Sequence, residues 1–215
     1  MKLAPEGNII IYPLTIAWIL SIIAVYVYSL DSLYIVSGVL SILLIFCLNF
    51  FRDPKRIVPK QDNLILSPAD GKIIKISDFA DPKSGEKLKL ISIFLSVFNV
   101  HANRMPIDGK FIDINHVKGE FLAAFDHKAS DKNERMEISI ETKIGIIKVK
   151  QIAGLVARRI LCHAKVGEKM QAGGRLGFIR FGSRTDIILP ASINLEIKLD
   201  QKVFGGETVI GKYGQ

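Results

Sequence analysis

The residues best suited to chemistry in this sequence are a serine, a histidine and an aspartate. Ser183 follows Gly182 in the string Arg-Phe-Gly-Ser-Arg. A serine hydroxyl is a weak nucleophile and needs a neighbouring base, ideally a histidine that a carboxylate orients. The pattern Gly-x-Ser-x-Gly, typical of many serine hydrolases, does not surround Ser183. The sequence therefore does not indicate an ordinary hydrolase nucleophile.

Four histidines could act as the base. His101 follows the apolar run from Ile91 to Val100. The others lie in polar stretches or near a turn: His116, His127 and His163. Taken alone, each histidine also fits a structural or solvated role. Asp70 is the candidate acid, but Asp-Gly is also a common turn dipeptide, so a turn-forming role is the alternative.

Three arginines are candidates for contacts with a phosphate group, because a guanidinium group matches phosphate through two parallel hydrogen bonds. They are Arg158, Arg159 and Arg184. Plain solvation at the surface is the alternative for at least one of them.

The elements that would position these residues are short strands. Several runs rich in Ile and Val alternate apolar with polar residues, as half-buried strands do. They span residues 72–77, 87–96, 136–142, 145–150 and 194–199. Turn dipeptides such as Asp70-Gly71 separate them. The pattern predicts a mainly antiparallel β body of sandwich or barrel type, with residues 119–135 as a loop or short helix.

Two segments of the body resemble the halves of biotinyl or lipoyl carrier domains. They are Ser67–Ile76 and Val166–Ile179, and the second contains the turn pattern Gly-Glu-x-Met-x-x-Gly. The expected fold is therefore a mainly β, barrel-sandwich body like that of those carriers. A carrier also presents a lysine at a hairpin tip between its halves, and no such tip is evident here.

The N-terminal part of the chain is apolar. No charged residue occurs from Ile9 to Leu30, Asp31 interrupts, and none occurs from Ser32 to Phe51. Each run approaches the roughly 20 residues that cross a bilayer as a helix. We predict a membrane-associated hydrophobic hairpin over residues 1–51 and a β domain over 52–215. A signal peptide, or a hairpin buried in a soluble core, are the alternatives.

The charge of the chain indicates an anionic partner. A net charge of +8 suits nucleic acid or the surface of a lipid leaflet, and the hairpin favours lipid. No basic stripe interleaved with aromatic residues indicates nucleic acid. The basic flank after the second run predicts the cytoplasmic face of the cell membrane; it contains Arg52, Lys55, Arg56 and Lys60. Only two cysteines occur, so no disulfide framework or cysteine-rich metal site is expected, and no metal is required.

Four ordered motifs are similar to those of a known enzyme family. They are Ser67-Pro-Ala-Asp-Gly, Phe98-Asn-Val-His-Ala-Asn-Arg-Met-Pro, Gln151-Ile-Ala-Gly-Leu-Val-Ala-Arg-Arg and Arg180-Phe-Gly-Ser-Arg. In this order and spacing the chain resembles the short form of phosphatidylserine decarboxylase proenzymes, over nearly all of the body. Relatives with His-x-x-His in the second motif have a second histidine where this chain has Arg104, so a division of roles between two histidines cannot be transferred.

The resemblance implies that the chain cuts itself between Gly182 and Ser183, into a large chain of residues 1–182 and a small chain of residues 183–215. Glycine has no Cβ to block the approach of the Ser183 hydroxyl to the preceding carbonyl. Attack gives an ester, and elimination and hydrolysis then leave a pyruvoyl group at position 183 and release ammonia. In this scheme His101 is the base and Asp70 orients it.

The pyruvoyl group is the cofactor that the resemblance implies. Its carbonyl would form a Schiff base with phosphatidylserine and act as the electron sink for decarboxylation to phosphatidylethanolamine and CO2. The implied partners are the lipid substrate, the membrane and the two fragments bound to each other, with further oligomerisation left open. The rival function is a non-enzymatic, membrane-tethered carrier-like or adaptor domain, which leaves Ser183 and His101 without a purpose.

Overall fold

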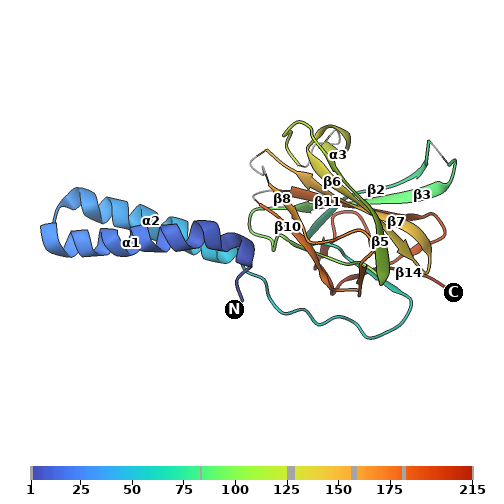
Figure 1. Cartoon of the computed structure of the whole chain (residues 1–215), viewed down its shortest axis with the longest axis horizontal. Helices are drawn as coiled ribbons and strands as arrows, with labels where there is room; N and C mark the ends of the chain where they lie inside the picture. Colours follow the sequence, from blue (N-terminus) through green and yellow to red (C-terminus); the bar gives the residue numbers. More distant parts are fainter. Residues whose placement is uncertain (1, 83, 125–128, 156–158, 181–182, 215) are drawn as a thin grey trace. The chain divides into compact units, whose positions relative to one another are not determined.

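The protein consists of two compact units, Met1–Lys55 and Arg56–Gln215 (Figure 1). The computed structural model describes residues 2–82, 84–124, 129–155, 159–180 and 183–214. The first unit is helical and apolar, and the second is mainly β, which confirms the predicted class of each part. Gly182, Arg158 and His127 lie outside the described residues.

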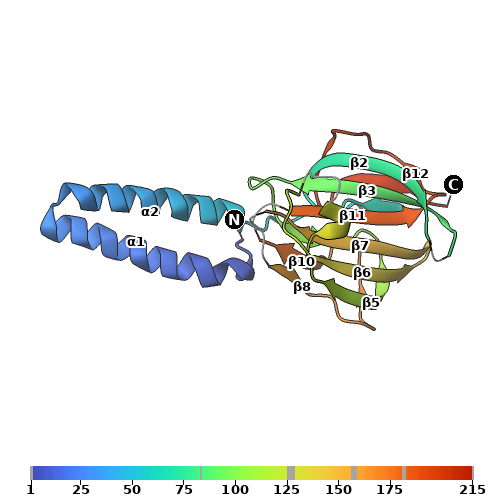
Figure 2. The same cartoon turned by 90° about the horizontal axis from the view of Figure 1, so that it is seen from above.

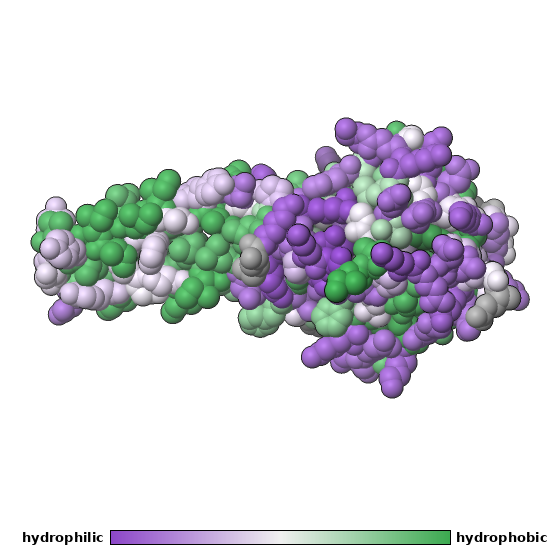
Figure 3. All heavy atoms as spheres, turned by 90° about the horizontal axis from the view of Figure 1, so that it is seen from below, coloured by the Kyte–Doolittle hydropathy of each residue, from purple (hydrophilic) through white to green (hydrophobic). Residues whose placement is uncertain are grey.

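The first unit is a helical hairpin. A 3-10 turn, η1 (Pro5–Gly7), leads into α1 (Asn8–Tyr28), and α2 (Asp31–Phe50) follows directly. The surface of these helices is predominantly hydrophobic (Figure 3). Both helices are long and apolar enough to cross a membrane, which suggests membrane association.

A polar seam joins the two helices of the hairpin. The Trp18 indole N–H donates to Ser41 Oγ at 2.8 Å, and the Ser37 hydroxyl donates to Ser21 Oγ at 2.9 Å. Polar side chains between apolar helices are stabilised by such bonds because neither lipid nor a hydrocarbon neighbour can satisfy them. The seam therefore holds α1 against α2.

The second unit is built on a curled sheet that forms a half-barrel. Among the described residues this sheet has eight strands in the order β13-β2-β3-β11-β7-β6-β5-β9, and the middle strands lie side by side in Figure 2. The strands are β2 (Gly71–Ala80), β3 (Lys87–Leu95), β5 (Gly109–Val117), β6 (Arg135–Thr142), β7 (Gly145–Ala153), β9 (Lys169–Met170), β11 (Ser183–Pro190) and β13 (Lys202–Val203). Each pairs antiparallel with its neighbours.

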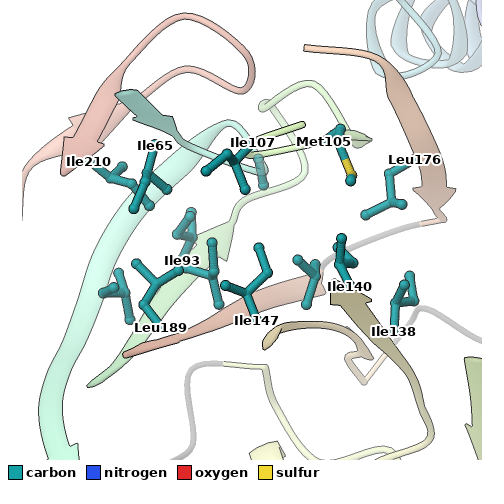
Figure 4. Packing of buried hydrophobic residues seen from close by; sticks show 14 of the residues in the cluster. Ile65, Ile93, Met105, Ile107, Ile138, Ile140, Ile147, Leu176, Leu189 and Ile210 are labelled. Carbon is teal, nitrogen blue, oxygen red and sulfur yellow. The ribbon is translucent and has the colours of Figure 1, made fainter. Parts of the chain in front are cut away.

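Two smaller sheets complete the unit. One has the order β4-β10-β8, from β4 (Ala102–Arg104), β10 (Arg175–Ile179) and β8 (Ile160–Cys162). The other has the order β1-β14-β12, from β1 (Leu64–Leu66), β14 (Val209–Lys212) and β12 (Asn194–Leu195). Buried side chains from all three sheets point toward one another and form one core (Figure 4). The labelled residues include Ile93 and Leu189 from the large sheet, Leu176 from β10 and Ile210 from β14.

The predicted strands are confirmed with different lengths. The alternating runs correspond to β2, β3, β6 and β7, but the last run forms only the two residues of β12. The strands β5, β10 and β11 were missed by alternation; β11 is buried on both faces, so its apolar and polar residues do not alternate by exposure. The polar segment 119–135 contains the short helix α3 (Ala129–Lys132). The specific carrier-like fold stays a prediction.

Candidate active site

Ser183 is the first residue of β11 and is 0% exposed. It pairs in register with Leu95 of β3 on one side and with Ala153 of β7 on the other. Its hydroxyl has no hydrogen-bond partner among the described residues. A buried polar group without a partner destabilises the fold, so its presence in a native protein requires an explanation, and a catalytic role is one such explanation.

His101 lies immediately before β4 and is also fully buried. Its carbonyl accepts the Ile179 N–H at 3.2 Å, and its ring centroid lies 6.4 Å from that of Phe178. Both neighbours belong to the end of β10 that leads toward Ser183. The structure therefore places the predicted base beside the C-terminal end of β10, whose last residue, Ile179, precedes Ser183 by four positions in the sequence.

A backbone carbonyl orients the His101 ring. Nδ1 of His101 lies 3.0 Å from the carbonyl oxygen of Asn99. When Nδ1 carries the proton and donates it to this carbonyl, Nε2 keeps its lone pair. This tautomer is the one that can accept a proton from a serine hydroxyl.

A chain of buried side chains connects β4, which begins just after His101, with the sheet that contains Ser183. Gln151 Nε2 donates to Asn103 Oδ1 at 2.7 Å, and Asn103 Nδ2 donates to Thr185 Oγ1 at 2.9 Å. All three side chains are fully buried, and we call them the amide bridge. Alternate residues of an extended chain share a face, so Asn103 lies on the side of His101 and Thr185 on the side of Ser183. The amide bridge therefore fixes the position of β4 relative to β11.

Asp70 lies at the same end of the large sheet. A Cβ on the next residue, Gly71, would be 2.2 Å from the carbonyl oxygen of Phe94, so only glycine fits between Asp70 and β3. Arg56 Nη2 lies 2.8 Å from each oxygen of the Asp70 carboxylate, and the Gly205 N–H donates to it at 2.8 Å. Asp70 is thus held by an arginine and a backbone amide at the Ser183 end of the large sheet, and its role in orienting His101 stays a prediction.

Arg56 also bonds to Glu207, which belongs to the C-terminal segment. Arg56 Nη1 lies 3.2 Å from Glu207 Oε2, and the Ile57 N–H donates to Glu207 Oε1 at 2.9 Å. The Ile57 N–H, together with the guanidinium group of Arg56, holds the pKa of Glu207 below its ordinary value of 4.5. The segment after the hairpin is therefore tied to both Asp70 and Glu207.

The three candidate arginines have different surroundings. Arg184 is fully buried, and its Nε donates to Asp186 Oδ1 at 2.7 Å. It lies on the opposite face of β11 from Ser183 because adjacent strand residues alternate. Arg159 is exposed, and Arg158 lies outside the described residues. The structure gives Arg184 an internal ion pair, and phosphate contacts by these arginines stay predictions.

Sequence reasoning missed several residues of the site. The amide bridge uses Asn103, Gln151 and Thr185, each inside or next to a motif that was noticed for other residues. Arg56 was interpreted only as part of a basic membrane flank, whereas its side chain is 6% exposed and paired with Asp70. A buried arginine leaves no signal in a sequence that is rich in lysine and arginine. Among the described residues, no group of three or more His, Cys, Asp or Glu side chains could hold a metal ion.

The fold and the site define a class: a mainly β protein with a buried serine at a strand end and a buried histidine whose ring faces a backbone carbonyl. The sequence model of the family described as phosphatidylserine decarboxylase matches residues 43–211. The chain belongs to this family.

Individual relatives agree. The phosphatidylserine decarboxylase proenzyme of Chlorobaculum tepidum is 40% identical over 215 residues, which cover 100% of this chain and 99% of the relative. The proenzyme of Chlorobaculum parvum is 45% identical over 168 residues, 78% of each chain. That of Geobacter sp. strain M21 is 44% identical over 171 residues, 79% of this chain and 78% of the relative.

Proposed function

We propose that this chain is a self-processing phosphatidylserine decarboxylase that forms phosphatidylethanolamine and CO2 at a membrane. One observation carries the assignment of the site. In a chain of this family, the serine of the Gly-Ser dipeptide is buried at a strand end, and its hydroxyl has no hydrogen-bond partner among the described residues. A buried histidine, whose Nδ1 faces a backbone carbonyl, lies beside the end of β10, the strand that precedes the serine.

Processing begins when His101 Nε2 takes the proton of the Ser183 hydroxyl and Oγ attacks the carbonyl carbon of Gly182. The amide becomes an ester as the nitrogen of Ser183 leaves that carbon. Removal of the Cα proton of residue 183 then expels the Gly182 carboxylate as the new C-terminus of the large chain. The remaining dehydroalanine tautomerises, and water releases ammonia and leaves the ketone oxygen.

The surroundings of Ser183 fit a pyruvoyl group. The site is enclosed, since Ser183, Leu95 and Ala153 are all fully buried, and no described group is hydrogen-bonded to the Ser183 side chain that the pyruvoyl group would replace. A pyruvoyl group supplies a carbonyl that condenses with the substrate amine and withdraws the electrons left by CO2. The chain's own contribution is to exclude water with β3 and β7 and to hold His101 for proton transfer.

Strand pairing keeps the two fragments together after the cut. β11, which begins the small chain, pairs with β3 and β7 of the large chain, and β14 pairs with β1. Arg56 and Glu207 form a further contact between them. We therefore expect the two fragments to form a stable heterodimer. Further oligomerisation, the carrier-like fold and the cytoplasmic location also remain parts of the proposal.

Intact-mass measurement of the purified chain tests the function. We expect two species, residues 1–182 and residues 183–215, the second with a mass that shows loss of its N-terminal nitrogen. Phosphatidylserine vesicles should then release CO2, and cyanoborohydride added with the lipid should attach the lipid covalently to the small chain. A single uncut species with no CO2 release would instead support the membrane-tethered adaptor.

A further inference from the structure

Four exposed apolar side chains lie at the end of the body where Ser183 lies. The side chains of Ile57, Phe98, Leu155 and Phe204 are 85%, 71%, 66% and 52% exposed, and we call these four residues the apolar rim. Single exposed apolar residues are common on proteins, so their number alone indicates nothing. Their common position is what requires an explanation.

Strand register places two of the rim residues on either side of Ser183. Leu95 of β3 and Ala153 of β7 both pair with Ser183, and both strands run antiparallel to β11. The chain therefore leaves both strands at the Ser183 end of the sheet. Phe98 comes three residues after Leu95, and Leu155 two residues after Ala153.

Phe98 is held outward by a tight turn. The Asn99 side-chain oxygen accepts the Ser96 N–H at 2.9 Å and the Ser96 hydroxyl at 2.8 Å. The Asn99 N–H in turn donates to the Ser96 carbonyl oxygen at 2.9 Å. The carbonyl of Asn99 also binds His101 Nδ1. The turn that presents Phe98 to solvent is thus the turn that orients the base.

The other two rim residues adjoin the contacts of Asp70. Ile57 follows Arg56, which pairs with Asp70, and Phe204 precedes Gly205, whose N–H bonds to Asp70. Val203 pairs with Gly71, so the chain from Val203 to Phe204 also runs out at this end of the sheet. All four apolar residues therefore lie at the Ser183 end of the large sheet.

Positive charge accompanies the rim. Arg159 is exposed, and its carbonyl accepts the Arg180 N–H at 3.2 Å, on the connection that leads to Ser183. Arginine beside aromatic and aliphatic residues matches a phospholipid surface, in which anionic headgroups lie above acyl chains. A contact between two copies of the chain would place these like charges close together.

We propose that the apolar rim inserts into the surface of an anionic phospholipid bilayer, with Arg159 at the headgroup level. The inference rests on the proposed function and adds how the substrate reaches Ser183. A diacyl lipid leaves a bilayer only at a large cost, because each CH₂ group must be exposed to water. A rim embedded in the bilayer lets the serine headgroup enter the site while the acyl chains stay in the membrane.

The first test compares two substrates of the self-processed full-length chain: phosphatidylserine in vesicles, and dihexanoyl phosphatidylserine as water-soluble monomers. The variants are Phe98→Ser and Leu155→Ser, with Ile146→Ser as the control. Ile146 is 55% exposed and lies at the opposite end of β7 from Leu155. We expect a roughly tenfold lower rate on vesicles for each rim variant, from the apolar area that no longer inserts. Processing, the rate on monomers and the control should be unchanged.

The outcomes distinguish failure of the membrane-insertion hypothesis from failure of the proposed decarboxylase function. Unchanged vesicle rates for both rim variants would overturn the insertion. Equal losses on vesicles and monomers would assign these residues to the site itself, and a changed oligomeric state would assign the rim to a contact between copies; both results contradict the proposal. Failure of the proposed function would appear differently, as a wild-type chain that does not decarboxylate either substrate.

A second test does not depend on activity. Trp18 is the one tryptophan of the sequence, so the double variant Trp18→Phe/Phe98→Trp reports on position 98 alone. In vesicles that contain phosphatidylserine and brominated phospholipid, insertion predicts quenching and a blue shift of its emission. Trp18→Phe/Ile146→Trp should show neither. Equal quenching at both positions, or at neither, would contradict the proposal.

Discussion

The polar residues on the two faces of β11 differ in their hydrogen bonding. On one face, Arg184 bonds to Asp186 and to Ser92 Oγ, and Asp186 accepts the Ser130 hydroxyl at 2.6 Å. On the other face, the hydroxyl of Ser183 has no partner among the described residues, and Thr185 belongs to the amide bridge. Both faces are fully buried, so burial does not explain the difference.

The comparison shows how structural and chemical polar groups can be distinguished within one strand. Charged groups in an interior stabilise a fold only when they are paired and hydrogen-bonded, as Arg184 and Asp186 are. A hydroxyl that is left without a partner in the same interior is suited to react, because no native bond must first be broken. We therefore propose that the Arg184 face stabilises the fold and that the Ser183 face carries out the processing.

The largest effect is expected from Ser183→Ala, because no hydroxyl remains to attack and no pyruvoyl group can form. The chain should stay uncut and inactive, as shown by intact mass and CO2 release. The matched control on the opposite face is Ser130→Ala, which should process normally. Ser183→Cys should cut slowly through the analogous thioester. A processed Ser183→Ala chain would assign the nucleophile elsewhere.

His101→Ala is expected to come next. Loss of a general base lowers a rate by about a hundred- to ten-thousandfold, so fragments should appear that much more slowly after synthesis. His116→Ala and His163→Ala serve as controls because both side chains lie outside the buried site, and His127→Ala is a third control outside the described residues. Rapid cutting by His101→Ala would show that another group acts as the base.

Removing the amide bridge should have an intermediate effect on the rate of processing. Asn103→Leu disconnects the two sheets, and misplacement of the base by about 1 Å can slow a reaction up to roughly a hundredfold. The variant also leaves Gln151 Nε2 unpaired, which lowers stability. Asn103→Leu/Gln151→Leu removes both amides and should recover part of the thermal stability while processing stays slow. Recovery of the processing rate together with stability would make the bridge merely structural.

The smallest effect on processing is expected on the other face of β11. Arg184→Met/Asp186→Leu replaces the buried ion pair with apolar side chains of similar length and should leave the processing rate near that of the native chain. Asp186→Ala alone should lower the free energy of unfolding by about 3–5 kcal/mol, because it leaves the Arg184 charge buried and unpaired. Loss of lipid turnover in the double variant, with normal processing and thermal stability, would instead support the hypothesis that Arg184 contacts the phosphate group of the lipid.

The sequence alone was sufficient for the apolar helical N-terminal part, the β class of the body and the family. Hydrophobic runs and alternation are local patterns, and four motifs in order identify relatives without any knowledge of contacts. The same motifs indicated Ser183, His101 and Asp70 as candidates. Their chemistry depends on residue type, which the sequence states directly.

Only the tertiary structure decided which side chains surround those candidates. Asn103 and Thr185 are 82 residues apart in the chain, and Arg56 lies in a connector whose charges resemble those of any solvated segment. The two faces of β11 also became distinguishable only in the fold, since Ser183, Arg184, Thr185 and Asp186 are all polar and all buried. The packing of distant strands determines which of these groups finds a partner, and no local periodicity records that packing.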